Sequence, residues 1–143
     1  MCGIFGGYNI SFNETEKGIN LISRGNDGIT IKDLENKSYF SARRHTVKFS
    51  GNEKNLLGTS DQPYFSEDKK ISLIFNGEFY NFNKYRDNLI EKGIKFESEG
   101  DTEVLLRLYK NFGINFLRDK KIDSLYSIAI YDANLNKIYI SRD

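Results

Sequence analysis

Cysteine, histidine and proline are nearly absent from the sequence, which holds one of each, and tryptophan is absent altogether. A single cysteine excludes an internal disulfide, and one cysteine with one histidine leaves too few soft ligands for a structural zinc site. An excess of charge is also missing, because 21 lysines and arginines balance 20 aspartates and glutamates. This balance gives no reason to expect nucleic acid or an acidic membrane surface as a partner.

Long apolar runs are missing as well. No stretch approaches the roughly 20 residues that span a bilayer, and the first residues lack the basic and apolar regions of a signal peptide. We therefore expect a cytoplasmic protein. Aromatic residues are abundant, with 11 phenylalanines and 9 tyrosines, and they favour strands and can fill the core of the single domain that 143 residues allow.

Short apolar and aromatic segments predict several strands. They are expected at residues 3–8, 29–32, 38–48, 71–75, 124–132 and 137–142. The last two strands flank a turn-forming segment and make a predicted hairpin. The mostly polar residues 50–70 read as a long loop, and Asn76-Gly77 is a turn signal that ends the strand at 71–75.

Three segments carry helix signals. Ser11 and Glu14 have the spacing of a capping box for a helix at about 13–23, a second helix is expected at 82–92, and Asp101 can cap a third. The order of elements predicts an α+β fold in which helices cover mainly antiparallel sheet.

Cys2 is the first candidate for chemistry. A thiol reacts as its thiolate and therefore needs a base. His45 is the only histidine. The alternative base is the α-amino group that Cys2 would carry after removal of Met1, because its pKa of about 7.7 to 8 leaves it partly neutral in the cell. From its position alone, Cys2 could equally be an incidental small residue.

Six short motifs, ordered along the whole chain, resemble those of glutamine amidotransferases of the N-terminal-nucleophile class, in the asparagine synthetase branch. They are Met1-Cys2-Gly3-Ile4-Phe5-Gly6-Gly7, Arg24-Gly25-Asn26-Asp27-Gly28, Gln62-Pro63, Asn76-Gly77-Glu78-Phe79-Tyr80-Asn81, Gly100-Asp101-Thr102-Glu103-Val104 and Ser141-Arg142-Asp143. Glu78 and Tyr80 favour this branch over the phosphoribosyl and hexosamine branches. The resemblance implies a four-layer αββα sandwich and a glutaminase activity in which Cys2 attacks the glutamine side-chain amide.

The resemblance also implies a role for each motif. The family builds its oxyanion hole from an asparagine side chain and a glycine N–H, here Asn76 and Gly77, although the pair alone reads as a plain hairpin turn. Arg44 matches the arginine that holds the substrate carboxylate, and backbone groups near Val47 would also contact the ligand. Arg43 is expected to be a solvated surface residue.

The substrate ammonium needs an acceptor, and the matching residue is Asp101, assisted by Glu78. A plain N-cap is the alternative for Asp101, and both roles can hold together. We interpret His45 as a strand residue beside the pocket, because the family needs no second base.

The sequence departs from the family in three places. Asn26 replaces a proline, residues 48–61 align poorly, and the chain stops after Arg142-Asp143, where the family's glutaminase domain continues. We therefore expect residues 1–143 to be one glutaminase domain, truncated before its final strands and lacking the synthetase domain. Such a sandwich could be incomplete and marginally stable, with the strand at 137–141 as an exposed edge.

The expected partners are L-glutamine and a synthetase domain or subunit that receives the ammonia. No cofactor is expected in this chain, because ATP and magnesium would belong to the absent synthetase domain, and no metal site is expected. A homo-oligomer is possible. Two alternatives stay open: a glutaminase for sugar or phosphoribosyl amination, and a non-catalytic glutamine-binding or interaction fragment.

Overall fold

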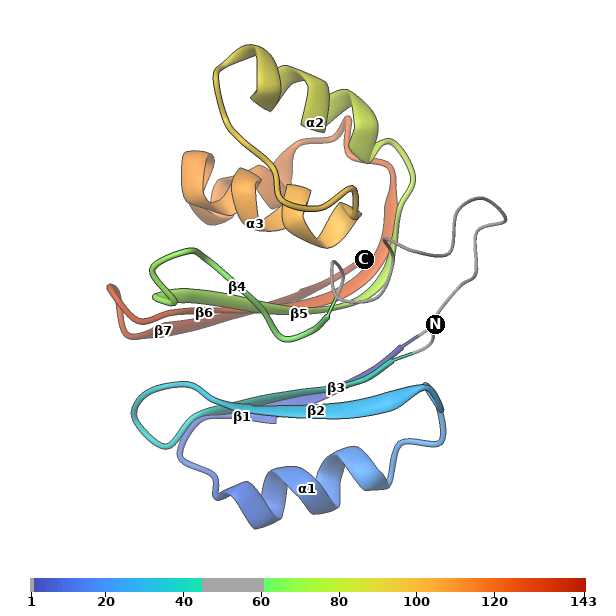
Figure 1. Cartoon of the computed structure of the whole chain (residues 1–143), viewed down its shortest axis with the longest axis vertical. Coiled ribbons are helices and arrows are strands. Elements are labelled where there is room, and N and C mark those ends of the chain that lie inside the picture. Colours follow the sequence, from blue (N-terminus) through green and yellow to red (C-terminus); the bar gives the residue numbers. More distant parts are fainter. Residues whose placement is uncertain (1, 45–60) are drawn as a thin grey trace.

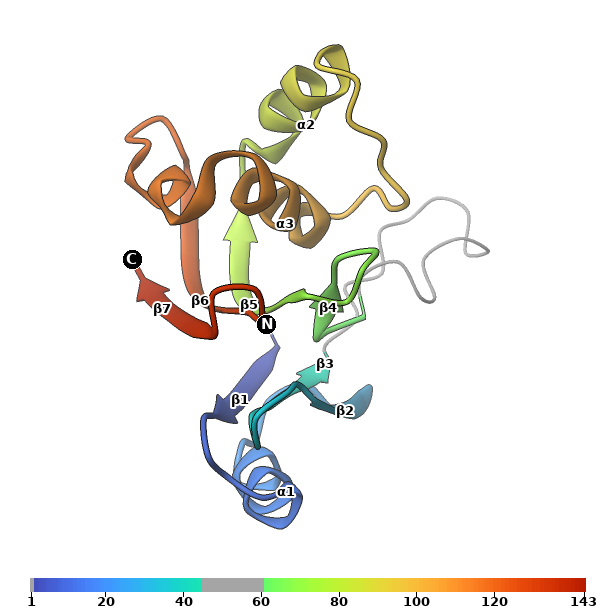
Figure 2. The same ribbon diagram turned by 90° about the vertical axis from the view of Figure 1, so that its left-hand side faces the viewer.

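The protein folds into four stacked layers in a computed structural model that describes residues 2–44 and 61–143 (Figure 1). Helix α1 (Phe12–Asn20) covers the outer face of one sheet, and α2 (Phe82–Glu91) and α3 (Asp101–Phe112) cover the outer face of the other. Figure 2 shows the same order of layers after a 90° turn, with the sheets viewed roughly from the ends of their strands. The expected α+β class and αββα sandwich are confirmed.

Both sheets are antiparallel throughout their described pairings. The first has the order β1-β3-β2, with β1 (Gly3–Gly7), β2 (Gly28–Asp33) and β3 (Tyr39–Arg44). The second has the order β4-β5-β6-β7, with β4 (Tyr64–Phe65), β5 (Ile71–Phe79), β6 (Ser124–Asp132) and β7 (Lys137–Arg142). The strand β7 is therefore an edge of the described sheet, as expected.

Two apolar clusters hold the layers together. Successive side chains of β5 point to opposite faces of the sheet, so this strand contributes residues to both clusters. Leu73 and Phe75 point toward α2 and α3 in the larger cluster. Ile74, between them, packs between the sheets with Phe40 and Tyr131, and Ile4 lies against this inter-sheet cluster. The site described below lies beyond that second cluster.

Local signals predicted several elements well. The capping box is present, since the Ser11 hydroxyl accepts from the Glu14 N–H and the Glu14 carboxylate accepts from the Ser11 N–H. The helix α2 and the β6–β7 hairpin also match their predicted ranges within one or two residues.

Other predictions were wrong. The strand β5 does not end at Asn76-Gly77 but continues to Phe79, because this segment pairs with Ser127 and Tyr126 of β6. The short strand β4 and the 3₁₀ helix η1 (Gly113–Arg118) were not predicted, β4 lying inside the expected loop. The helix α3 begins at Asp101, so Gly100 is its N-cap, without a side-chain cap. Residues 45–48 of the third predicted strand lie outside the described residues.

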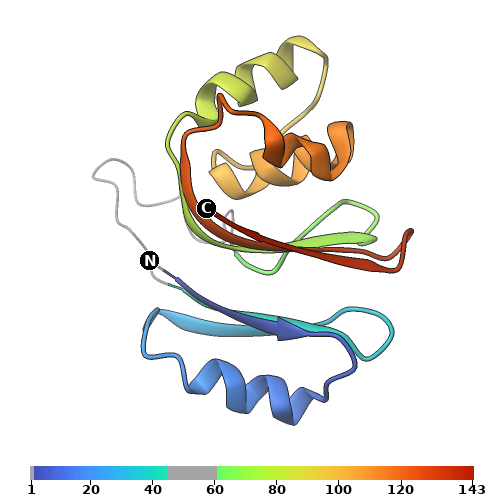
Figure 3. The ribbon, with the colours of Figure 1, turned by 180° about the vertical axis from the view of Figure 1, so that it is seen from behind.

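The two ends of the sandwich differ. At one end, the Asn36 amide donates to Asn136 Oδ1 at 3.0 Å and Lys70 Nζ lies 2.9 Å from Glu35 Oε1, so the turns of the two sheets are joined. At the other end β1 begins and β5 ends (Figures 1 and 3). None of the helices in the described ranges is long and apolar enough to cross a membrane.

Candidate functional site

The start of β1 places Cys2 at the open end of the first sheet. Gly3 pairs with Arg43 on β3, and Arg44 pairs with Gly28 on β2. The antiparallel register therefore brings the backbone of Cys2, just before Gly3, to the level of Arg44. Cys2 is partly exposed and is a free thiol. Two predicted site residues thus share one end of the sheet.

Arg43 is not the surface residue that the sequence suggested. Its guanidinium donates from Nη1 to the Ile22 carbonyl at 2.6 Å and from Nε to the Gly25 carbonyl at 3.4 Å. Gly25 has φ +75°, and a Cβ there would lie 2.3 Å from the Arg43 carbonyl oxygen. Arg43 therefore fastens the segment after α1 to β3. His45 and Val47 lie outside the described residues.

The second sheet carries Asn76, Gly77 and Glu78 on the last part of β5. A Cβ on Gly77 would lie 2.0 Å from the Leu125 carbonyl oxygen, so only glycine lets β6 approach this closely. Asn76 is partly buried, and its Oδ1 is one of the buried side-chain atoms in the described ranges that have no hydrogen-bond partner. The hairpin-turn alternative for Asn76-Gly77 is therefore wrong.

Asp101 lies beside this strand. Its Oδ2 accepts from the Phe79 N–H at 3.3 Å, and its Oδ1 accepts from the Thr102 hydroxyl at 3.3 Å. Burial raises the pKa of Asp101, and the negative charge of Glu78 adds to the rise. A cation near both carboxylates would lessen that repulsion.

Strand alternation relates the two halves of the site. Cys2 lies two residues before Ile4, and Asn76 lies two residues after Ile74. Ile4 and Ile74 belong to the same inter-sheet cluster, and β1 contacts β5. Both steps lead toward the end of the sandwich where β1 begins and β5 ends (Figure 1). We infer that Cys2 and Asn76 face the same inter-sheet space.

Two residues of the sequence motifs support β5 in ways that sequence reasoning did not assign. Gln62 Oε1 accepts from the Phe75 N–H at 2.6 Å and so continues the β4–β5 pairing with a side chain, next to Asn76. Asn81 donates to the Lys121 carbonyl and accepts from the Asp123 N–H, which joins the end of β5 to the start of β6. Their presence in short motifs was the only available signal.

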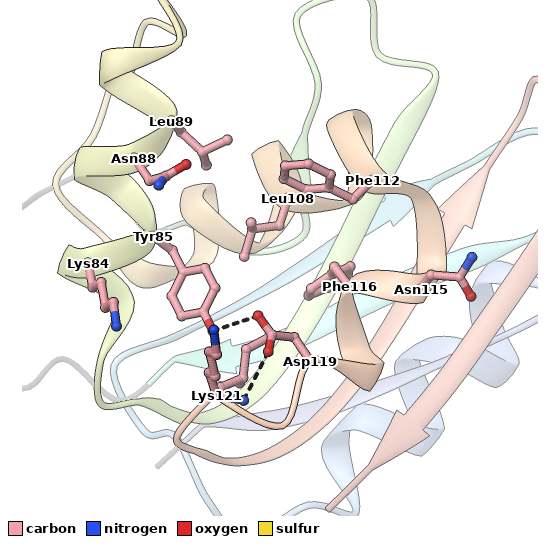
Figure 4. Close-up of a pocket in the computed structure, with 11 residues that line it drawn as sticks. Lys84, Tyr85, Asn88, Leu89, Leu108, Phe112, Asn115, Phe116, Asp119 and Lys121 are labelled. Carbon is pink, nitrogen blue, oxygen red and sulfur yellow. Dashed lines mark hydrogen bonds between the residues drawn. The ribbon is translucent and has the colours of Figure 1, made fainter.

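A separate cavity of about 570 Å³ lies in the outer helical layer, between α2, α3 and η1 (Figure 4). Its apolar side includes Leu108 and Phe116, and at its rim the Tyr85 hydroxyl donates to Asp119 at 2.9 Å. None of the predicted site residues lines it. This cavity is therefore separate from the site predicted from the sequence.

Comparisons with known proteins agree on the family. The sequence pattern of the glutamine amidotransferase domain matches residues 1–143. Two asparagine synthetases [glutamine-hydrolyzing] of Bacillus subtilis (strain 168), numbers 2 and 1, are 31% and 30% identical over 146 residues, covering 100% of this chain. They are covered over 19% and 22% of their own lengths. Asparagine synthetase [glutamine-hydrolyzing] 1 of Arabidopsis thaliana is 36% identical over 59% of this chain and 14% of its own length.

A solved structure supports the fold. Glutamine phosphoribosylpyrophosphate amidotransferase from B. subtilis, in complex with ADP and GMP, superposes with a TM-score of 0.69 over 100% of this chain and 37% of its own. At 22% identity, this likeness concerns the fold alone. The family match over residues 1–143 shows more: the chain belongs to the glutamine amidotransferase domain family, and over its whole length it is similar to part of the B. subtilis asparagine synthetases.

Proposed function

We propose that this domain hydrolyses glutamine with Cys2 as nucleophile and Asn76 and Gly77 as oxyanion donors. One observation carries the proposal. Asn76-Gly77 lies within β5 and not in a turn. Asn76 follows Ile74 by two residues and Cys2 precedes Ile4 by two residues, and Ile4 and Ile74 both pack in the inter-sheet cluster. This arrangement supports a site in which the thiol of Cys2 and the amide of Asn76 face the same end of the space between the two sheets.

The reaction would proceed by acyl transfer. The α-amino group of Cys2, freed by removal of Met1, takes the thiol proton, and the sulfur attacks the side-chain amide carbon of glutamine. The amide oxygen becomes negative and is stabilised by the Asn76 amide and the Gly77 N–H. The carbon–nitrogen bond breaks, ammonia leaves with the proton, and water then hydrolyses the thioester to glutamate.

The proposed contacts with the substrate use its two charged ends. Arg44, with backbone groups near Val47, would hold the carboxylate, since a guanidinium fork matches a carboxylate. Asp101 and Glu78 would accept the ammonium, which relieves their mutual repulsion. The raised pKa of Asp101 supports this assignment.

The chain spans about a fifth of the length of the B. subtilis relatives it matches. We propose that the ammonia serves an asparagine-synthetase-like amination in a partner domain or subunit, which would bind ATP and magnesium. A glutaminase for phosphoribosyl or sugar amination is the second candidate. The cytoplasmic location, the lack of a cofactor in this chain and a homo-oligomer remain predictions.

The test of the mechanism is Cys2→Ala with intact-mass spectrometry. The variant should release no ammonia from glutamine yet still bind glutamine in calorimetry, and the mature parent protein should lack Met1. Asn88→Ala, on the exposed side of α2, is the matched control and should keep full activity. Normal turnover by Cys2→Ala would refute the nucleophile, and active protein that retains Met1 would refute the α-amino base.

A further inference from the structure

Glu103 carries a buried charge that no role described above uses. Its side chain is 0% exposed, and it lies in the first turn of α3, two residues after Asp101. A buried carboxylate costs free energy unless donors surround it. The donors around Glu103 therefore indicate what this residue holds in place.

Two of the donors are backbone groups in the segment 94–100, which joins α2 to α3. The Ser98 N–H donates to Glu103 Oε2 at 2.6 Å, and the Glu97 N–H lies 3.1 Å from each carboxylate oxygen. Glu103 thus binds the chain immediately before Asp101. Glu103, a residue of α3, therefore holds the segment that immediately precedes α3.

Further hydrogen bonds come from Arg107, one turn further along α3. Its Nη2 and Nε donate to Glu103 Oε1 at 2.8 and 3.2 Å, and its Nη1 donates to Glu67. Burial acts to raise the pKa of Glu103, but the hydrogen bonds from Ser98, Glu97 and Arg107 outweigh it and lower the pKa. The carboxylate is therefore ionised at neutral pH.

The same segment is also held from its other side. Arg86 of α2 donates from Nη1 to the Ser98 carbonyl at 2.8 Å. The guanidinium carbons of Arg86 and Arg107 lie 5.0 and 5.9 Å from the centre of the Phe96 ring. Gly100 gives α3 no side-chain cap, and these contacts hold the segment that leads directly into Asp101.

We propose that Glu103 is a positioning residue for the ammonium group of glutamine. It fixes residues 97–100, so that the Asp101 carboxylate stays on the Phe79 N–H and faces the ligand beside Glu78. The inference rests on the proposed function, since it takes Asp101 as the ammonium acceptor. Glu103 itself does not touch the substrate.

The experiment compares two ligands by titration calorimetry in the Cys2→Ala protein: glutamine, and 4-carbamoylbutanoate, which is glutamine without its ammonium. The parent should bind glutamine about tenfold or more tightly than the analogue, because a charge-assisted contact is lost in the analogue. Asp101→Asn should bind the two ligands with nearly equal affinity. Glu103→Gln should reduce the affinity ratio strongly while the affinity for 4-carbamoylbutanoate stays unchanged, and the double variant should lose nothing more.

Glu67→Gln is the matched control, because it also removes a partner of Arg107 but leaves the contacts of Glu103 with residues 97 and 98 in place. It should keep the parent ratio. Arg86→Gln, which releases Ser98 from the partly exposed side, should lower the ratio and decides the question if Glu103→Gln does not fold.

The outcomes separate this inference from the proposed function. Suppose that Asp101→Asn binds the two ligands equally but Glu103→Gln keeps the affinity ratio of the parent. That result overturns the positioning role alone, and Arg86→Gln replaces Glu103→Gln in this comparison if only Arg86→Gln folds. Equal weakening of both ligands by Glu103→Gln assigns it a general structural role and overturns the inference as well. A parent that binds both ligands equally overturns the assignment of Asp101 and this inference with it.

Discussion

At the scale of single residues, Gly77 shows how a backbone contact restricts a proposed catalytic position. Its neighbours are backbone atoms of β6, the Leu125 carbonyl oxygen and the Tyr126 Cα, at 2.0 and 2.8 Å from the place of a Cβ. Backbone atoms within a sheet cannot rotate away as a side chain can. Any side chain at 77 must therefore push β5 and β6 apart, next to Asn76.

Gly77→Ala should destabilise the protein by about 3 kcal/mol and abolish ammonia release, because overpacking shifts the strand that carries the oxyanion donors. Gly93→Ala is the control, since Gly93 has φ +84° and open space around its Cβ position. It should cost only about 1 kcal/mol, from the positive φ, and keep activity. Urea unfolding and an ammonia assay give both values. An unchanged unfolding midpoint in Gly77→Ala would show that the sheet has room there.

Asn76→Ala should lower kcat about 100- to 1000-fold while KM changes little, because the lost donor acts where negative charge develops. Steady-state kinetics with glutamine make the measurement. If the change appeared only in KM, Asn76 would be a ground-state binding residue and not an oxyanion donor.

At the scale of elements, one ion-pair network joins α3 to the turn between β4 and β5. Glu67 accepts from Lys110 Nζ at 2.7 Å and from Arg107. The hydrogen bond from Lys110, followed by that from Arg107, lowers the pKa of Glu67 to about 2. The Glu67 side chain is 49% exposed, so water screens the pair and its net contribution is modest.

The lowered pKa predicts how this contribution varies with pH. Glu67 is ionised and paired above its ordinary pKa of 4.5, so its stabilisation is complete there and is lost as pH falls toward about 2. Glu67→Gln should therefore be less stable than the parent by about 1 kcal/mol or less at pH 7, and the difference should vanish near pH 2. Urea midpoints at several pH values test this. A difference independent of pH would mean that packing, not charge, is lost.

The elements also show what the sequence could predict. Signals within a few residues worked for the capping box of α1 and for the β6–β7 hairpin, because the stabilising contacts are themselves local. The end of β5 was missed because pairing with β6 overrides the local turn preference of Asn76-Gly77. The motifs named Cys2, Asn76 and Asp101, but the tie of Arg43 to residues 22 and 25 depends on a fold that no local pattern reveals.

At the scale of the whole molecule, the proposed site is divided between the two sheets. Cys2 lies next to the first sheet, Asn76 and Gly77 lie on β5 of the second sheet, and Asp101 begins α3, which packs on that second sheet. Their separation depends on the inter-sheet cluster, in which Ile74 is 2% exposed. The thickness of this packed layer therefore influences catalytic geometry, although none of its side chains takes part in the reaction.

Ile74→Ala should destabilise the protein by about 2 to 5 kcal/mol, through lost burial and the cavity left behind. It should also lower kcat, because the two sheets can shift relative to each other. Ile140→Ala on β7 is the control, since Ile140 is 82% exposed, and it should change stability by about 0.5 kcal/mol or less. Urea unfolding and kinetics of both variants decide. Full activity in a destabilised Ile74→Ala protein would show that the catalytic geometry does not depend on the packing between the sheets.

The division of the site between two sheets also gives the order of synthesis a meaning. Proteins emerge from the ribosome N-terminus first, and residues 3–44 contain the described strands of the first sheet, β1 to β3, whereas β5 can pair with β6 only after β6 has been made. During this interval the proposed nucleophile is present without its proposed oxyanion donors. Its hydrolytic partner groups arrive only when the second sheet closes. The proposed glutaminase site would therefore become active only after both sheets have formed.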